Sequence, residues 1–198
     1  MAGYSSFSLK MVKNKFGLLE KKVNLFEKTL SAAPTPLLTQ TLARGQRRIA
    51  LNVEKSRSEF LVAPVMLEVA EIYADKIGVL SGENLDADKS QNLNGECDFI
   101  ILGVPESSTV EMPLLCLVET ESTNIMTGLG QCTAQMLGAR LLNERENTPQ
   151  SCIYGCVTTG YEWVFLKLEN QLIYIDVVHY PIDALPKILG IFKAIIEK

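Results

Sequence analysis

Histidine and long hydrophobic runs are scarce in this sequence. His179 is the single histidine among 198 residues, which excludes metal sites built from several histidines. It also lies in no recognisable motif, so a histidine-based catalytic triad is disfavoured. No apolar run approaches the roughly 18 residues that a transmembrane helix needs, and residues 1–16 lack the apolar segment of a signal peptide. We therefore predict a protein with no membrane partner.

The cysteines argue against a disulfide framework. There are five of them, an odd number, and none shows CxxC spacing. Small secreted domains usually carry paired cysteines, whereas cytosolic proteins keep their thiols reduced. We therefore predict reduced thiols and a cytoplasmic location.

The composition fits one folded domain, but its charge is unevenly distributed. The chain is 47% hydrophobic and 21% charged, with a net charge of −4. Residues 1–58 contain 11 Lys or Arg and 3 Asp or Glu, a balance of +8, whereas residues 59–198 contain 8 and 20, a balance of −12. This asymmetry is typical of a basic surface for phosphates beside an acidic site for cations. Lysines on solvated helix faces are the alternative explanation.

The helical patterns divide the single domain, residues 1–198, into three parts. We expect a basic, helical N-terminal extension over residues 1–55, a core over residues 56–177 and a C-terminal helix over residues 178–198. The predicted helices are one or two short pieces between Ser6 and Lys28 broken near Gly17, then Pro36 to about Arg47, Ser56 or Ser58 to Lys76, Met126 to Arg145, and a last helix from Asp183. Thr35 is the predicted N-cap of the helix that starts with Pro36.

The strand patterns predict a mixed central sheet flanked by helices. The predicted strands are residues 78–82, Cys97–Val104, Met112–Thr120, Ile153–Thr158, Trp163–Leu168 and Leu172–Val177. The segment Pro105–Ser108 is expected to form a hairpin turn. Short strands mixed with crossover helices indicate an α/β or α+β layer structure.

Acidic residues in and beside these strands are the candidates for chemistry. Asp98 lies among apolar strand residues, where a carboxylate is costly to bury unless it is paired or binds a metal. Glu119 and Glu121 are two apart in a strand, so they share a face, and two such carboxylates repel each other without a cation or strong solvation. Mg²⁺ prefers such hard oxygen ligands. Solvated strand ends are the alternative, and Glu59 can equally be explained by favourable charge in a first helical turn.

Several segments together resemble one known family. They are Ser58–Pro64, Leu93–Ile100, Val118–Asn124 (Val-Glu-Thr-Glu-Ser-Thr-Asn), Gly128–Cys132 and Ile153–Gly160 with Trp163. In this order they resemble a cyanobacterial family of uncharacterised proteins in the PD-(D/E)xK, or restriction-endonuclease-like, superfamily. The resemblance spans residues 56–168 and, more weakly, the whole chain. It implies a restriction-endonuclease-like core.

The resemblance also implies roles for individual residues. Asp98 and Glu119 would bind the metal, Mg²⁺ or Mn²⁺, and Glu59 would be an accessory acid. Gln131 would face the site from the following helix. The metal would polarise the scissile phosphate and bind the attacking water. Glu121 stands where the superfamily pattern has a lysine, and it could instead act as a general base if its pKa were raised.

Three functions are compatible with these residues. The first is a metal-dependent nuclease that hydrolyses DNA, with the basic N-terminal third contacting phosphates. The second is a catalytically inactive protein of the same fold that binds nucleic acid or a protein, because Glu121 replaces the lysine. The third is an oligomerisation module, such as a homodimer, driven by the apolar C-terminal helix.

Overall fold

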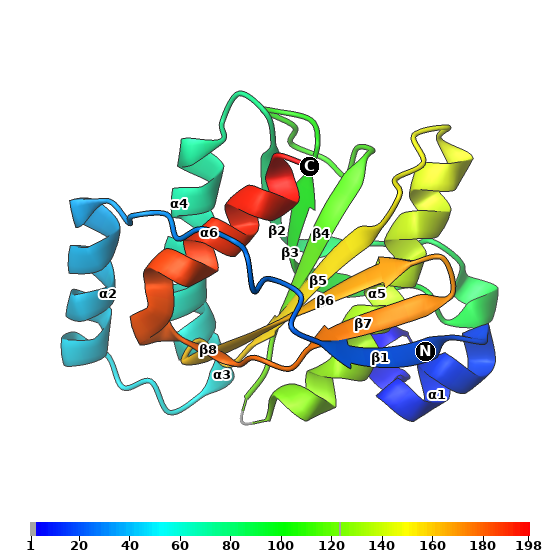
Figure 1. Ribbon diagram of the computed structural model, residues 1–198, viewed down its shortest axis with the longest axis horizontal. Coiled ribbons are helices and arrows are strands. Elements are labelled where there is room, and N and C mark those ends of the chain that lie inside the picture. Colours follow the sequence, from blue (N-terminus) through cyan, green and yellow to red (C-terminus); the bar gives the residue numbers. More distant parts are fainter. Residues whose placement is uncertain (1–2, 123) are drawn as a thin grey trace.

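The computed structural model describes residues 3–122 and 124–198. Thr123, part of one segment that carries the resemblance, lies outside these residues. Within the described ranges, the chain forms an eight-stranded mixed sheet with helices on both faces (Figure 1). The predicted α/β class with a mixed central sheet is therefore confirmed.

The sheet contains every predicted strand and two further ones. Its strands are β1 (Leu19–Val23), β2 (Gly78–Asn84), β3 (Glu96–Leu102), β4 (Leu114–Thr120), β5 (Ile153–Thr158), β6 (Glu162–Glu169), β7 (Leu172–Asp176) and β8 (Tyr180–Pro181). They follow the order β1-β7-β6-β5-β4-β3-β2, and β8 also pairs with β6. The pairs β1–β7 and β4–β5 are parallel, and the others are antiparallel. Strands β3 and β4 form a hairpin, as expected from the turn predicted at Pro105–Ser108, and helix α5 supplies the crossover that the parallel pair β4–β5 requires.

Helices cover the sheet on both sides. The α-helices are α1 (Leu9–Phe16), α2 (Pro36–Arg48), α3 (Glu54–Arg57), α4 (Ala63–Ile72), α5 (Ile125–Arg145) and α6 (Leu185–Ile196), the 3₁₀ turns are η1 (Tyr4–Ser6), η3 (Lys89–Gln91) and η4 (Ile182–Ala184), and η2 (Ser58–Val62) is a π-helical turn. As predicted, Thr35 caps α2: its Oγ1 accepts a hydrogen bond from the N–H of Leu38 (3.2 Å), and Pro36 takes the first position.

The N-terminal extension is not entirely helical, contrary to the prediction. Gly17 ends α1 in the left-handed region (φ 66°), and the residues after it form β1 at the edge of the sheet beside β7. Leu19 is two-thirds exposed. Strand β1 therefore lacks the alternation of buried and exposed residues by which a strand is recognised in a sequence. Its structure comes from backbone pairing with β7, which only the tertiary fold supplies.

The long helix before the sheet begins earlier than predicted and changes pitch. It starts at Glu54 and runs through η2 into α4, ending at Ile72. Within it, the N–H of Ala63 bonds the carbonyl of Ser58, five residues back. Glu54 is therefore the acid in the first turn, and Glu59 lies in the π turn instead. Such π turns frequently occur at functional sites.

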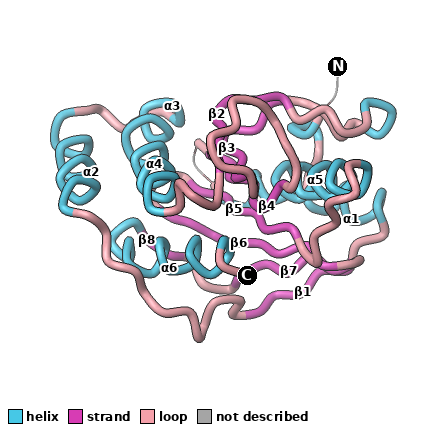
Figure 2. Tube along the Cα trace, turned by 90° about the horizontal axis from the view of Figure 1, so that it is seen from above, coloured by secondary structure: helices cyan, strands magenta, loops and turns pink. Residues whose placement is uncertain are grey.

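Each face of the sheet has its own hydrophobic core. Helix α5 packs on one face together with α1 and η1, and helices α4 and α6 cover the other (Figure 2). Along α6, Ile188, Ile191 and Phe192 are completely buried. The apolar stripe that suggested an oligomerisation module is therefore packed inside the protein. None of the helices in the described ranges has the length and apolarity to cross a membrane.

Candidate functional site

Asp98 and Glu119 come together at one end of neighbouring strands. In the antiparallel pair β3–β4, Phe99 lies opposite Val118, so the residue before Phe99 and the residue after Val118 reach the same end of the hairpin. There the N–H of Thr120 donates to Oδ2 of Asp98 (2.6 Å). Asp98 and Glu119, 21 positions apart in the sequence, thus lie at the same end of the hairpin.

Two glutamine amides hold the carboxylate of Glu119. Gln131 and Gln135 lie one turn apart on α5, and the side-chain amide of Gln131 donates to Oε1 while that of Gln135 donates to Oε2 (2.7 Å). Glu119 is only 6% exposed. Burial, followed by the nearby charge of Asp98, raises its pKa well above the usual glutamate range, and the bond from Gln135 opposes this shift only in part. Gln131 therefore faces the site as predicted, and Gln135 is a further residue of the site.

Glu121 also turns towards α5. Its Oε2 accepts a hydrogen bond from Oγ1 of Thr127 (2.9 Å). A Cβ atom at Gly128 would lie 2.6 Å from Cγ of Glu121, so the glycine leaves room for this side chain. Burial raises the pKa of Glu121, and Glu54 and Asp98 raise it further. Glu119 and Glu121 thus share a side, as their spacing predicts.

An acid-lined cavity of about 350 Å³ opens beside Asp98. Its lining includes Glu54, Ser58, Glu59, Glu96, Asp98 and Thr120. The hydroxyl of Thr120 is buried and has no hydrogen-bond partner in the described parts of the chain. The cavity therefore offers the carboxylates of its lining to a ligand, whereas the Thr120 hydroxyl lies buried beneath it.

Glu54 is a further acid of this cavity, and its pKa responds to the charge of Asp98. Burial raises the pKa of Glu54, and the charge of Asp98 adds to the shift. Glu59 also lines the cavity, but it forms an ion pair with Lys55 (3.2 Å). The sequence analysis missed Glu54 because it placed the start of the helix too late.

Arg57 is a basic residue whose charge acts on Glu54, yet it forms no ion pair with the acids of the site. It is 6% exposed and donates to three backbone carbonyls: Nε to Thr159 (2.9 Å), Nη1 to Leu51 (3.0 Å) and Nη2 to Ser122. Its charge lowers the pKa of Glu54. Because its guanidinium is engaged by backbone, Arg57 does not replace the lysine of the superfamily pattern. It fixes the loops that follow β4 and β5.

The donor set fits a loosely coordinated Mg²⁺ or Mn²⁺. Among residues 3–122 and 124–198, Glu54, Asp98, Glu119 and Glu121 form no ion pair within 4.0 Å, so their repulsion is not relieved by a lysine or arginine. The same residues contain no group of three or more His, Cys, Asp or Glu side chains arranged around one ion. Mg²⁺ commonly uses one or two carboxylates and several waters. Two neighbouring acids, Asp98 and Glu119, match that mode, whereas a closed protein cage does not.

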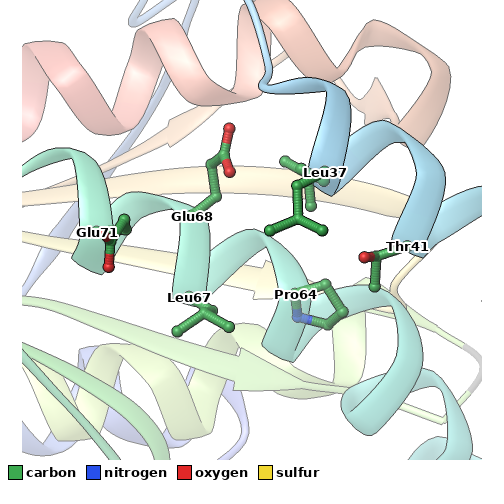
Figure 3. Close-up of a pocket in the computed structure, with 7 residues that line it drawn as sticks. Leu37, Thr41, Pro64, Leu67, Glu68 and Glu71 are labelled. Atoms are coloured by element: carbon green, nitrogen blue, oxygen red, sulfur yellow. The ribbon is translucent and has the colours of Figure 1, made fainter.

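A second cavity, of about 400 Å³, lies between α2 and α4 (Figure 3). It is largely apolar, with Leu37, Pro64 and Leu67 in its lining. Glu68 in this cavity accepts hydrogen bonds from the N–H (2.7 Å) and hydroxyl (2.8 Å) of Thr35, so its carboxylate holds the start of α2. The acids discussed above do not line this cavity, and we place the candidate site at the acid-lined one.

No protein-family model matches the chain, and a search of curated proteins finds no match either. The class that the coordinates define is a mixed α/β protein with a carboxylate site at one end of the β3–β4 hairpin.

Proposed function

We propose that the chain is a metal-dependent nuclease of the PD-(D/E)xK type, with a restriction-endonuclease-like core, that hydrolyses DNA phosphodiester bonds. The observation that carries the proposal is that Asp98, which lines the acid-lined cavity, lies beside the buried Glu119, and that neither acid forms an ion pair among the described residues. Burial raises the pKa values of Glu54, Asp98, Glu119 and Glu121, and a neighbouring carboxylate adds to each shift, so a divalent cation can replace protons at this site.

In this proposal Asp98 and Glu119 hold Mg²⁺ or Mn²⁺. The bound ion supplies Lewis-acid chemistry, polarising the phosphate and lowering the pKa of a bound water. Gln131 and Gln135 fix the orientation of the Glu119 carboxylate, the role that partners of metal ligands usually have. Glu121 accepts a proton from water at Oε1, the oxygen that Thr127 leaves free, and its raised pKa makes it a stronger base than an ordinary glutamate.

Incubation with supercoiled plasmid and with single-stranded DNA in Mg²⁺ and in Mn²⁺ tests the proposal. Wild-type protein should cut at least one of these substrates, and Asp98→Ala should cut neither. Glu71→Ala is the matched control and should cut like wild type, because it removes an exposed acid that does not line this cavity. Equal cleavage by wild type and Asp98→Ala would refute the assignment.

A catalytically inactive nuclease-fold protein is the second candidate. It is favoured by the engagement of both Glu119 oxygens with amides and by Glu121 in the position of the lysine. Calorimetry with Mn²⁺ separates the two candidates: binding without turnover supports the inactive protein. Gain of cleavage by Glu121→Lys would indicate that the lysine had been lost from an active ancestor.

A further inference from the structure

A cleft lined by arginines shares the π turn η2 with the acid-lined cavity. It encloses about 260 Å³ between α2 and η2, and its lining is Thr41, Arg44, Gly45, Arg48, Ile49 and Phe60. The lining contains no acid. The π turn η2 contributes to both cavities, because Ser58 and Glu59 line the acid-lined one and Phe60 lines this cleft.

The two arginines are free to bind an anion. Arg44 and Arg48 are four residues apart, so they lie on one face of α2. Neither forms a hydrogen bond or an ion pair through its side chain with any residue that the structure describes. Helix α2 has three arginines and no acid, so nothing on the helix itself offsets their charge.

The cleft is held in shape by close packing. A Cβ atom at Gly45 would lie 3.0 Å from the carbonyl oxygen of Phe60, so the glycine brings α2 close to η2. Phe60 remains 37% exposed at the cleft. An aromatic face beside two guanidinium groups suits a nucleotide chain, which offers phosphates for ion pairing and bases for stacking.

Charge at the end of a helix is the competing explanation for the arginines. Basic residues in the last turn of a helix are favoured by its dipole, and Arg47 fits this role because its Nε donates to the carbonyl of Ala43 (3.1 Å). Arg44 lies further inside α2 and lines the cleft instead. A dipole role changes helix stability alone, whereas a binding role changes affinity for a ligand.

We infer that Arg44 and Arg48 bind phosphates of a nucleic-acid strand and direct that strand past the π turn to the acid-lined cavity. The inference takes its class of ligand from the proposed function. The strand contacts the cleft at phosphates other than the one presented to Asp98 in the acid-lined cavity. The acid cluster alone repels a polyanion, and the arginine cleft supplies the attraction that overcomes this repulsion.

Binding without divalent ions tests the inference separately from hydrolysis. Fluorescence anisotropy with a labelled 20-nucleotide strand and its duplex, in EDTA and over a salt series, compares wild type with Arg44→Ala/Arg48→Ala. The double variant should bind about 10- to 100-fold more weakly, and the slope of log affinity against log salt should fall by about 1.4 to 1.8, since each lost phosphate contact accounts for roughly 0.7 to 0.9.

The matched control is Lys21→Ala/Lys22→Ala, which removes the same charge from the exposed part of β1. It should bind within about threefold of wild type, and Arg44→Lys/Arg48→Lys should keep most of the affinity, since a lysine still pairs with phosphate. Circular dichroism verifies that each variant is folded; if the alanine pair is unfolded, the comparison of the lysine pair and Arg44→Gln/Arg48→Gln with wild type decides the question.

Three results would overturn the inference: no nucleic-acid binding by wild type, equal weakening by both alanine pairs, or tighter binding of poly-glutamate than of the strand. Strand binding that depends on Arg44 and Arg48 but is followed by no cleavage in Mg²⁺ or Mn²⁺ would remove the proposed nuclease activity and leave this inference standing.

Discussion

Glu119 is the residue whose surroundings differ most from those of a surface glutamate. It is buried beside Asp98, and burial is the main cause of its raised pKa. The pKa values of Asp98, Glu121 and Glu54 are raised as well, each mainly by burial. In the folded protein these groups hold protons at pH values where the unfolded chain has released them.

The first prediction is a fall in metal-free stability as pH rises. Between the unfolded pKa, about 4.3 for glutamate, and the higher folded pKa, the folded state binds more protons than the unfolded state. The free energy of unfolding therefore decreases with pH in this window. Urea unfolding in EDTA from pH 4.5 to pH 8 should show the decrease, and Glu119→Gln should flatten it. The buried Oε1 of Gln135 has no partner in the described residues. If the Gln135 amide turns over, this oxygen can accept a hydrogen bond from the amide of the side chain that replaces Glu119. An unchanged pH profile in Glu119→Gln would contradict this account.

The second prediction concerns Gln131, whose side-chain amide donates to Oε1 of Glu119. Gln131→Ala removes the donor to Oε1, so the carboxylate loses orientation and charge stabilisation. Loss of such a partner typically weakens metal binding about 10- to 100-fold, and calorimetry with Mn²⁺ at pH 7.5 measures the change. Gln40→Ala, at an exposed position of α2, is the control and should bind Mn²⁺ like wild type. Equal affinities of the two variants would exclude an orienting role for Gln131.

At the scale of elements, the helix from Glu54 to Ile72 and the loops after β4 and β5 are joined by one side chain. Arg57 bonds carbonyls of Leu51, Ser122 and Thr159. A Cβ atom at Gly160 would lie 3.2 Å from Cβ of Arg57, so the loop after β5 passes close to the helix. These contacts set the distance between Glu54 on α3 and the acids at the end of β4.

The third prediction concerns the three hydrogen bonds that Arg57 donates to backbone carbonyls. Arg57→Ala leaves three carbonyls without their charged donor, and bonds to charged groups contribute about 1.5–3 kcal/mol each at most in net terms. Because loops can rehydrate part of the loss, we expect about 2–4 kcal/mol of destabilisation in urea unfolding. Arg47→Ala removes the same side chain from an exposed site, with its bond to Ala43 and its charge in the last helical turn, and should change stability by less than about 1 kcal/mol. Similar effects of the two substitutions would mean that Arg57 does not join these elements.

The sequence patterns predicted the buried strands. They missed the parts of the structure that form only through contacts with distant segments of the chain. Strands such as β4 and β5 are apolar runs covered on both faces, and their pattern is sufficient. Strand β1 is a mostly exposed edge, so its sequence carries no period. Asp98 and Glu119 were predicted through the resemblance, whereas Gln135 was missed although its spacing of four from Gln131 places both on one helix face.

At the scale of the whole molecule, the acids and the basic residues lie in different parts of the fold. The acidic site lies at the end of the β3–β4 hairpin, and α2 with its arginines lies outside α4, away from the sheet (Figures 1 and 2). A bound cation therefore acts on a local excess of negative charge that Lys55 and Arg57 offset only at Glu59 and Glu54. Metal binding should for this reason be visible in the stability of the whole domain.

The fourth prediction is that Mn²⁺ raises the melting temperature, and that the increase grows with pH. A ligand at 100 times its dissociation constant stabilises the folded state by about 2.7 kcal/mol, which corresponds to roughly 5–10 °C for a domain of this size. Protons compete with the metal for Asp98 and Glu119, whose pKa values are raised. The increase should therefore be larger at pH 8 than at pH 5.5, opposite to the trend in metal-free stability. Differential scanning calorimetry with and without Mn²⁺ at both pH values measures it, and Asp98→Asn should lose the increase at each. A pH-independent increase, or one that Asp98→Asn retains, would show that the ion binds elsewhere on the protein.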